Sequence, residues 1–363
     1  MKVAYMFGGM NRGGAETLLL DVFRNWRKAP FSFIGIHRKS GAYQEDFYTA
    51  GPVLYQLAPR RLGYMRYLLQ LRKILKNEGI TIVHTQHWLD CIYAYLATIG
   101  INVCIINTFH GYSVVSGIKG IPRRLSIRLA DDVCFVSGYE LQWFKQQMKI
   151  HDSKCHILYN AIDFSKLDMA KANDEICVST GRIRLAMVGN FVTVRDHRTI
   201  MRALLILSER GVTNFDFYFI GKRVDDEAYL YDECVRISEE NKMNHTHFLG
   251  ARGDVPSLLK AMDGFVYCTD HDTFGIAVVE AIAAALPVVV NDHPVMQEVC
   301  GAPNAGVRYF RTNDADDAAV QIADMITNIQ QSKQDAQMNA DRIRERYSIQ
   351  THIDNAYHIY LSL

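Results

Sequence analysis

Strand-like and helix-like segments alternate along the chain, and this alternation constrains the fold more than any other feature of the sequence. Apolar runs of strand length occupy residues 2–7, 31–37, 81–86, 104–110, 132–137, 182–189, 215–221, 246–250, 264–269 and 287–292. Stretches with helical periodicity, such as 62–79, lie between several of them. The pattern predicts an α/β protein in which helices cover both faces of parallel sheets.

The alternation is interrupted once and then resumes. Residues 163–181 are polar and lack a sustained period, and a chain of 363 residues suits two domains. We predict an N-terminal Rossmann-like domain at 1–165, a linker at 166–181, a C-terminal Rossmann-like domain at 182–345, and a final helix at 346–363 that packs back toward the N-terminal domain. Ligands of such sheets bind beyond the carboxyl ends of the strands. The site is therefore expected in a cleft between two facing sheets.

The composition indicates a soluble chain that works in a reducing compartment. No stretch reaches the roughly 18 consecutive apolar residues of a membrane helix, and the N-terminus lacks the apolar core of a signal peptide. We therefore expect a cytoplasmic protein. The 8 cysteines form no CxxC pair, which favours free thiols. His84 and His87 have metal-like spacing but no further ligands, so no metal site is expected.

Charge is distributed unevenly along the sequence. Residues 1–180 carry a net charge of +8 and the remainder carries −7. Basic residues surround the amphipathic stretch 62–79, and three more follow at Arg123, Arg124 and Arg128. This distribution favours an anionic or lipid-linked acceptor and peripheral contact with the inner face of an anionic membrane. Ordinary surface charge is the alternative, and no nucleic-acid partner is expected.

A glycine-rich turn, FGGMNRGGAE at 7–16, follows the first strand and precedes a helix. Gly13 and Gly14 let a ligand approach the backbone, and the amides at a helix start attract anions. The spacing is not GxGxxG and the second strand ends in basic residues, which disfavours a nicotinamide-dependent oxidoreductase. His110 ends another strand and is suited to bind a sugar hydroxyl. A turn without a ligand and a structural histidine are the alternatives.

A second strand-to-helix loop lies in VGNFVTVRDHRTIMRAL at 188–204, with a helix expected to begin near Asp196. Arg195 stands at this junction, where an arginine clamps a diphosphate while the helix dipole adds to the attraction. Lys222, in FIGKR, follows the next strand and brings a further positive charge to a comparable edge. A solvated surface arginine is the alternative interpretation.

The most specific segment is TDHDTFGIAVVEAIAAALPVVVND at 269–292. A helix is expected to begin near Phe274 and to be buried, with Glu280 as its single charge. Burying a carboxylate is costly unless it is hydrogen-bonded, and a ligand diol would satisfy it. The amides of Phe274, Gly275 and Ile276 are then available to phosphates or sugar hydroxyls. The alternatives are an internal salt bridge for Glu280 and a helix N-cap for Asp272.

These segments together resemble glycosyltransferase family 4, the retaining enzymes with a GT-B fold. The resemblance is carried, in chain order, by GGAE at 13–16, HG at 110–111, NAID at 160–163, VGNFVTVRDH at 188–197, FLGARGDVPSLLKAMDGFVYCT at 248–269 and DTFGIAVVEAIAAALPVVVND at 272–292. It implies two Rossmann-like domains whose parallel sheets face each other across a cleft. Each motif is weak alone, and their order and spacing make the resemblance specific.

The resemblance also implies roles for individual residues. Glu280 corresponds to the second acidic residue of the E-x7-E motif and would bind the donor ribose. Asp272 corresponds to the first, which faces the donor sugar. Arg195 stands where the family has a phosphate-binding lysine, and His110 would lie at the reaction centre. Catalytic roles thus fall on His110, Asp272 and Arg195, and donor binding on Gly13, Gly14, Asn190, Arg195, Lys222, Phe274, Gly275, Ile276 and Glu280.

The sequence departs from the family pattern at several of these positions. Asn190 stands where an arginine is usual, and Lys222 is the residue suited to replace its charge. Asp272 is one methylene shorter than the usual glutamate, which bears on the sugar accepted. HPVMQE at 293–298 lacks the usual glycine pair before its glutamate.

The predicted activity is retaining transfer of a sugar from a nucleoside-diphosphate sugar, with UDP favoured over GDP, to a hydroxyl of a glycan or lipid-linked acceptor. A role in bacterial surface polysaccharide or glycolipid synthesis follows from the resemblance. Basic side chains and helix amides would stabilise the leaving diphosphate, so we expect neither metal nor cofactor. A nucleotide-sugar epimerase of the same fold and a non-catalytic nucleotide-sugar-binding subunit are the alternatives.

Overall fold

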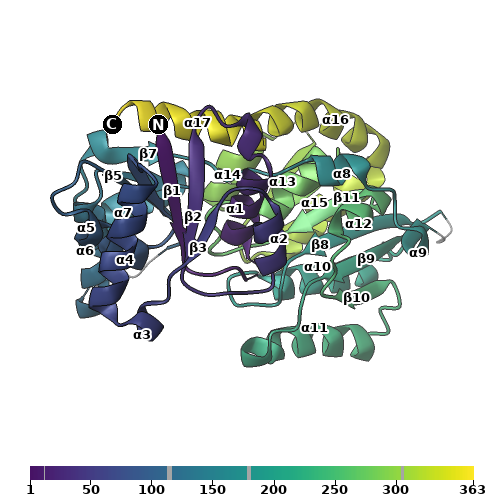
Figure 1. The fold of residues 1–363 in the computed structure, drawn as a ribbon. Helices are drawn as coiled ribbons and strands as arrows, with labels where there is room; N and C mark the ends of the chain where they lie inside the picture. The colour runs from purple at the N-terminus through teal and green to yellow at the C-terminus, as the bar shows by residue number, and fades with distance from the viewer. Residues whose placement is uncertain (12, 113–116, 178–180, 304–305) are drawn as a thin grey trace. The chain divides into compact units, whose positions relative to one another are not determined.

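The computed structural model describes residues 1–11, 13–112, 117–177, 181–303 and 306–363. These residues form two compact units (Figure 1). Unit 1 consists of Met1–Ile162 together with Tyr347–Leu363, and unit 2 consists of Asp163–Arg346. The chain therefore passes from unit 1 to unit 2 and returns for its last helix.

Unit 1 is built on a parallel sheet. Its described strands, in spatial order, are β3 (Leu54–Gln56), β2 (Ser32–His37), β1 (Lys2–Phe7), β4 (Ile82–Thr85), β5 (Cys104–Phe109), β6 (Asp132–Phe135) and β7 (Cys155–Ile157). The strand order reverses between β1 and β4, which are neighbours with Val3 opposite Ile82. The central strands are buried on both faces, which explains their nearly continuous apolar sequences.

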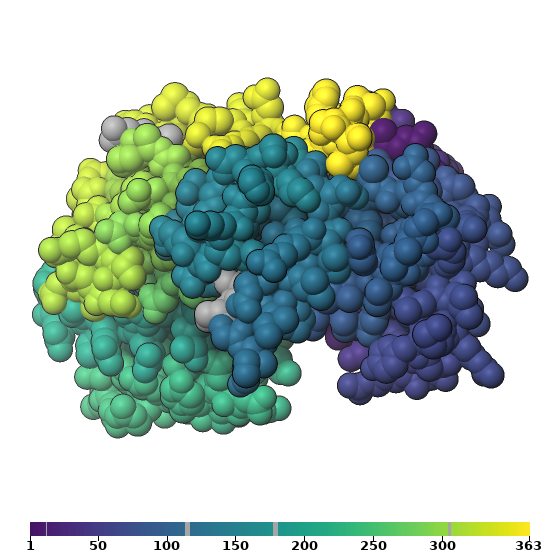
Figure 2. Space-filling view, turned by 90° about the vertical axis from the view of Figure 1, so that its left-hand side faces the viewer, coloured from purple at the N-terminus to yellow at the C-terminus, as the bar shows by residue number. Residues whose placement is uncertain are grey.

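Helices cover both faces of this sheet. They are α1 (Gly14–Arg24), α2 (Gln44–Thr49), α3 (Pro59–Leu62), α4 (Tyr64–Asn77), α5 (Trp88–Thr98), α6 (Ile121–Leu129), α7 (Gly138–Gln147) and α17 (Ile349–Leu361), with 3-10 turns at Trp26–Lys28, Ile118–Gly120 and Asp152–Lys154. Helix α17 packs with α1 on one face, while Tyr67, Leu71 and Leu75 of α4 contribute to the core on the other. The yellow C-terminal residues accordingly lie against the purple N-terminal ones in Figure 2.

A buried polar network connects α17 to the sheet of unit 1. The hydroxyl of Tyr360 lies 3.0 Å from that of Tyr5 and 2.6 Å from Nδ1 of His84. On its other side, Nε2 of His84 lies 2.6 Å from the hydroxyl of Thr108. Burial lowers the pKa of His84 to about 3, and the nearby His352 and His110 add to this effect. The C-terminal helix is thus fastened to strands at the other end of the sequence.

Unit 2 is built on a second parallel sheet. Among the residues described, its strands in spatial order are β10 (Thr246–Gly250), β9 (Phe215–Ile220), β8 (Ile183–Val188), β11 (Gly264–Tyr267), β12 (Val288–Asn291) and β13 (Val307–Phe310). The order reverses between β8 and β11, where Leu185 pairs with Gly264. The covering helices are α8 (Ser165–Met169), α9 (Asp174–Cys177), α10 (His197–Glu209), α11 (Ala228–Glu240), α12 (Val255–Ala261), α13 (Ile276–Ala283), α14 (Pro294–Cys300), α15 (Ala315–Thr327) and α16 (Ile329–Arg346), with a 3-10 turn at Asp225–Glu227.

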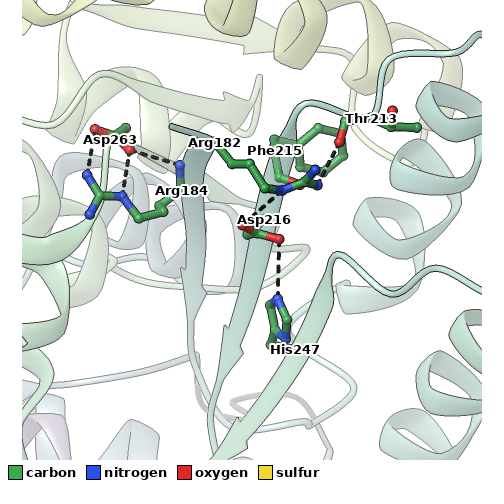
Figure 3. Close-up of polar contacts among 7 residues, drawn as sticks. All are labelled: Arg182, Arg184, Thr213, Phe215, Asp216, His247 and Asp263. Atoms are coloured by element: carbon green, nitrogen blue, oxygen red, sulfur yellow. Dashed lines mark hydrogen bonds and ion pairs between the residues drawn. The ribbon is translucent and has the colours of Figure 1, made fainter. Parts of the chain in front are cut away.

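Charged pairs occupy the amino-terminal ends of the strands in unit 2 (Figure 3). Arg182 Nε lies 3.0 Å from Asp216, whose other carboxylate oxygen lies 3.4 Å from Nε2 of His247. Arg184 pairs with Asp263 at 2.9 Å. Burial alone would raise the pKa of Asp263, but hydrogen bonds from neighbouring cations outweigh it and lower the pKa. These charges satisfy one another, so this edge of the sheet has a structural role.

The stretch expected to be a linker, 166–181, contains most of α8 and all of α9. Both helices contact α12, and residues 178–180 lie outside the described part of the chain. None of the described helices combines the length and apolar character needed to cross a bilayer. Seven cysteines are free thiols in the structure, and the side chain of Cys177 lies outside the described residues.

Candidate active site

The loops that follow β8 and β9 meet at the carboxyl edge of the unit 2 sheet. A Cβ atom on Gly221 would lie 1.8 Å from the carbonyl oxygen of Gly189, so the two backbones pass each other only because Gly221 has no side chain. The side-chain oxygen of Asn190 accepts a hydrogen bond from the amide of Lys222 at 3.0 Å. The structure thus brings two predicted donor-binding residues together, and both are exposed.

Arg195 lies at the start of α10, as the sequence predicts. Asp196 caps this helix by accepting a hydrogen bond from the amide of Thr199 at 3.0 Å. The Arg195 side chain passes over Gly189, where a Cβ atom would lie 2.6 Å from its Cδ. Its Nε donates to the hydroxyl of Tyr267 at 2.9 Å, and this is its only side-chain hydrogen bond to residues that the structure describes. The terminal nitrogens of the guanidinium therefore remain available for a ligand.

Tyr267 joins Arg195 to Asp272. Its hydroxyl accepts from Arg195 and donates to the Asp272 carboxylate. Burial and the negative charge of Asp272 raise the pKa of Tyr267, so the phenol stays protonated and keeps donating. Tyr267 and then Asp272 also raise the pKa of Arg195 against the opposing effect of burial. Two residues predicted to act on the donor are therefore held in one hydrogen-bonded chain.

Thr269 organises the loop that carries Asp272. Its hydroxyl accepts from the amide of Asp272 at 3.1 Å and donates to the carbonyl of Val194 at 2.9 Å. Its own amide donates to the buried side chain of Asn291 at 3.1 Å, and Asn291 donates back to its carbonyl at 2.8 Å. The Asp272 loop and the loop before α10 are thus fixed to each other through one side chain.

Helix α13 begins at Ile276 rather than near Phe274, so this sequence prediction was wrong by two residues. Gly275 adopts a left-handed conformation with φ +85° and caps the helix, while Phe274 is buried. A Cβ atom on Gly275 would lie 2.7 Å from Cε of Met296. The glycine is required both by its backbone angle and by the close approach of α14. The amides of Gly275 and Ile276 stand at the helix N-terminus, where intrahelical partners are lacking.

Glu280 lies on α13, but it is only partly buried. The interpretation of a carboxylate enclosed in an apolar helix was therefore too strong. Helix α13 packs into the core through Val278, Val279, Ala281, Ile282 and Ala283. Glu280 is not among these buried residues, so it lies on the less buried side of the helix. A partly open carboxylate costs less to keep charged and is accessible to a ligand.

The remaining predicted residues belong to unit 1. Gly13 caps α1 with an extended backbone, and the helix begins at Gly14. His110 follows β5, and its Nε2 lies 2.7 Å from the side-chain oxygen of Gln86. Its Nδ1 is buried, and the side chain of Asn160 lies close enough to act on the pKa of His110, which it raises. Burial, followed by the effect of His352, lowers the pKa of His110 to about 4, so the imidazole is neutral at physiological pH.

Two residues that contact the predicted site residues or their neighbours, Tyr267 and Glu140, escaped the sequence analysis. Tyr267 was noticed only as part of an apolar strand, although a hydroxyl in such a strand needs a buried partner. Glu140 of α7 is buried and contacts the backbone amides of Val136 and Gly111, the residue after His110. Burial raises the pKa of Glu140 to about 8 despite these amides. Ser137 and Glu140 have the S-x-x-E spacing of a capping box, a signal that was available in the sequence.

Two parallel sheets with a ligand-binding carboxyl edge on each Rossmann-like unit define the GT-B class of glycosyltransferases. The Anabaena protein HepE in complex with UDP has this fold, with a TM-score of 0.86 at 16% identity over 100% of both chains. Residues 12–166 match the model of glycosyltransferase family 4, and residues 171–342 match glycosyl transferases group 1. The chain belongs to this family and is a glycosyltransferase.

The similar sequences are bacterial. EpsF of Bacillus subtilis (strain 168) is 24% identical over 80% of this chain and 79% of its own length. The UDP-Gal:alpha-D-GlcNAc-diphosphoundecaprenol alpha-1,3-galactosyltransferase of Escherichia coli is 22% identical over 63% of this chain and 62% of its own length. The predicted fold and family are thereby confirmed, while the assignment of individual site residues stays a prediction.

Proposed function

We propose that this glycosyltransferase is a retaining enzyme that transfers a sugar from a UDP-sugar to a hydroxyl of a glycan or lipid-linked acceptor in bacterial surface polysaccharide or glycolipid synthesis. The observation that carries the proposal is the chain from Arg195 through Tyr267 to Asp272 at the carboxyl edge of unit 2. It holds a guanidinium in a fixed position, and such a cation stabilises the negative charge that grows on a departing diphosphate. The names of the UDP complex and of the E. coli relative support the choice of donor and acceptor.

In the proposed reaction, the bond between the anomeric carbon and the diphosphate breaks, and the acceptor oxygen bonds to that carbon on the same face. The acceptor proton leaves with the departing diphosphate. Arg195 and Lys222 stabilise the growing negative charge together with the amides of Gly275 and Ile276. Asp272 faces the electron-poor sugar. Glu280 receives the ribose hydroxyls, and neutral His110 binds the reacting sugar.

The experiment that tests this proposal compares Arg195, which immediately precedes the N-cap of α10, with Arg198 in the first turn of that helix. Arg195→Ala is expected to lower kcat/KM for sugar transfer by roughly a hundredfold, because one electrostatic donor contributes on the order of 3 kcal/mol to the transition state. The matched control is Arg198→Ala, since Arg198 faces Glu233 at 3.7 Å on the partly exposed side of α10. Near-wild-type turnover of Arg195→Ala, or an equal loss in both variants, would contradict the assigned role.

The finer parts of the proposal need separate measurements. Thermal stabilisation by UDP-sugars but not GDP-sugars would support the donor, because a ligand stabilises the state that it binds. An α-linked product from an α-linked donor, observed by NMR, would support retention. Undiminished turnover after treatment with EDTA would support metal independence. A product consisting of epimerised free sugar would favour an epimerase instead.

Peripheral contact with an anionic membrane is part of the proposal. Helix α4 exposes Tyr64, Met65 and Leu69, with exposed fractions of 61%, 72% and 63%, and the exposed Arg66 lies among them. Such a mixture of apolar and basic side chains is typical of helices that lie in a membrane interface. Co-sedimentation with vesicles containing phosphatidylglycerol, and its loss in a Met65→Ser/Leu69→Ser variant, would support it. Equal recovery of the two proteins would argue against it.

A further inference from the structure

An open pocket of about 210 Å³ lies in unit 1, at the carboxyl ends of β4 and β5. Its lining includes Gln86, His87, Trp88, His110, Tyr112 and Arg123. It is smaller than the roughly 300–1,000 Å³ of a site that encloses a whole drug-sized ligand. The pocket therefore fits one or two chemical groups of a larger molecule rather than all of it.

Arg123 gives the pocket an uncompensated positive charge. Its guanidinium carbon lies 5.2 Å from the centroid of the Trp88 ring, and its Nη1 donates to the carbonyl of Lys119 at 3.1 Å. Its Nε is buried and has no hydrogen-bond partner among the described residues, none of which supplies a carboxylate to it. The nearby Arg38, by contrast, pairs with buried Asp90 at 2.6 Å. Arg123 is partly buried, and a guanidinium that has a shielded Nε and no counter-ion among the described residues favours an anionic ligand.

The positive charge of Arg123 also acts on His87. Burial lowers its pKa to about 4, and the charges of Arg38 and Arg123 add to this effect. Its Nδ1 accepts a hydrogen bond from the amide of Leu89 at 3.2 Å, so in the neutral ring the proton resides on Nε2. That N–H is a further donor in the pocket lining.

The surroundings of Arg123 are apolar. Trp88 and Tyr112 contribute aromatic surface to the lining, which suits the apolar faces of a sugar ring. Outside the pocket, Ile118, Ile121 and Leu125 are exposed by 85%, 49% and 41% on α6 and the preceding turn. A cation at the pocket and an apolar exterior beside it match a sugar that is carried on a phosphate group with a hydrocarbon tail.

We propose that this pocket binds a phosphate group of the acceptor through Arg123 and His87, and thereby presents the attached sugar to His110. The proposal rests on the proposed function and specifies its acceptor as a phosphate-linked sugar. The phosphate contacts the guanidinium and the Nε2–H of His87, while the sugar lies against Trp88. The chemical step is the one already proposed, with Arg123 acting in binding only.

The test measures transfer to three acceptors that share N-acetylglucosamine: a neutral octyl glycoside, an octyl diphosphate, and an undecaprenyl diphosphate in vesicles. For Arg123→Gln we expect at least a tenfold rise in KM for both diphosphates and little change for the neutral glycoside. Arg123→Lys is expected to recover part of the loss. Arg128→Gln is the matched control, because Arg128 is exposed on the same helix.

The outcomes separate this inference from the proposed function. Hydrolysis of the donor without acceptor depends on the residues proposed to act on the donor and involves no acceptor phosphate, so Arg123→Gln should leave its rate unchanged. If wild type uses the neutral and diphosphate acceptors equally, or Arg123→Gln raises the KM of all three alike, the phosphate pocket is wrong while the transferase activity stands. If wild type neither hydrolyses nor transfers any donor sugar, the proposed function fails. Activity on the undecaprenyl diphosphate but not its octyl analogue identifies the lipid as a required part.

Discussion

At the scale of single residues, the candidate donor site depends on Tyr267, which is proposed to position the donor-binding residues rather than to bind the donor itself. Tyr267 is fully buried at the end of β11 and hydrogen-bonds to both Arg195 and Asp272. A guanidinium on a flexible side chain loses conformational entropy when it binds phosphate. The phenol holds Nε in place beforehand, so less of that entropy is lost during the reaction.

Replacing Tyr267 by phenylalanine should therefore affect the chemical step more than substrate affinity. We expect Tyr267→Phe to lower kcat by about tenfold or more, since a hydrogen bond to a charged group contributes about 1.5–3 kcal/mol. Steady-state kinetics with saturating acceptor measure the effect. Tyr231→Phe is the control, because the Tyr231 ring packs against Phe191 at 4.9 Å and so tests loss of a hydroxyl elsewhere in unit 2. Unchanged kcat in Tyr267→Phe would show that Arg195 needs no such support.

At the scale of elements, apolar runs predicted the long buried strands because burial on both faces leaves a continuous signal in the sequence. The strands β3, β7 and β13 were missed, since each has only three or four residues and lies at a sheet edge. Partial exposure of these edge strands removes the pattern on which the prediction depends. The start of α13 was misplaced for a different reason. Gly275 adopts a left-handed backbone conformation that delays the helix until Ile276, and its close contact with Met296 of α14 is a long-range feature that the local sequence does not show.

That contact makes Gly275 the position where the helix start can be tested. Gly275→Ala requires an alanine at φ +85° and a Cβ atom 2.7 Å from Met296, which we expect to destabilise unit 2 by about 1–3 kcal/mol. UDP affinity should fall as well, because the amides of α13 would shift. Urea unfolding and calorimetric titration measure the two effects.

Gly253→Ala is the matched control, because a Cβ atom there meets nothing within 4 Å. It should change neither stability nor UDP affinity appreciably. A loss of stability in Gly275→Ala with unchanged UDP affinity would show that the amides of α13 do not contact the donor.

At the scale of the whole molecule, α17 belongs to the core of unit 1 although unit 2 separates it from the rest in sequence. The sequence analysis predicted a final helix that packs back toward the N-terminal domain. It could not identify the contacting residues, because Tyr5, His84 and Tyr360 meet only in three dimensions. The same holds for the pocket around Arg123, because Trp88 and Arg123 lie on different helices. Long-range polar contacts leave no periodic signal, so this part of the structure was not predictable from one sequence.

The buried histidines make the attachment of α17 sensitive to acid. His84 has a pKa of about 3 in the folded chain and an ordinary value of 6.5 when unfolded, so between these values the unfolded chain binds the additional proton. Stability is therefore fully present above pH 6.5 and is lost as the pH falls. For His84 alone, we expect the free energy of unfolding to fall by about 2 kcal/mol between pH 7 and pH 5.

Urea unfolding of unit 1, followed by the fluorescence of its tryptophans at pH 7 and pH 5, measures this loss. His84→Gln should unfold more easily at pH 7, because it cannot reproduce both hydrogen bonds, but its stability should depend less on pH than that of wild type. The exposed His151 provides the control, since His151→Gln should keep the wild-type dependence. If His84→Gln kept the full wild-type dependence, the acid sensitivity would have to come from His110, His352 or other groups, and the network around Tyr360 would serve packing alone.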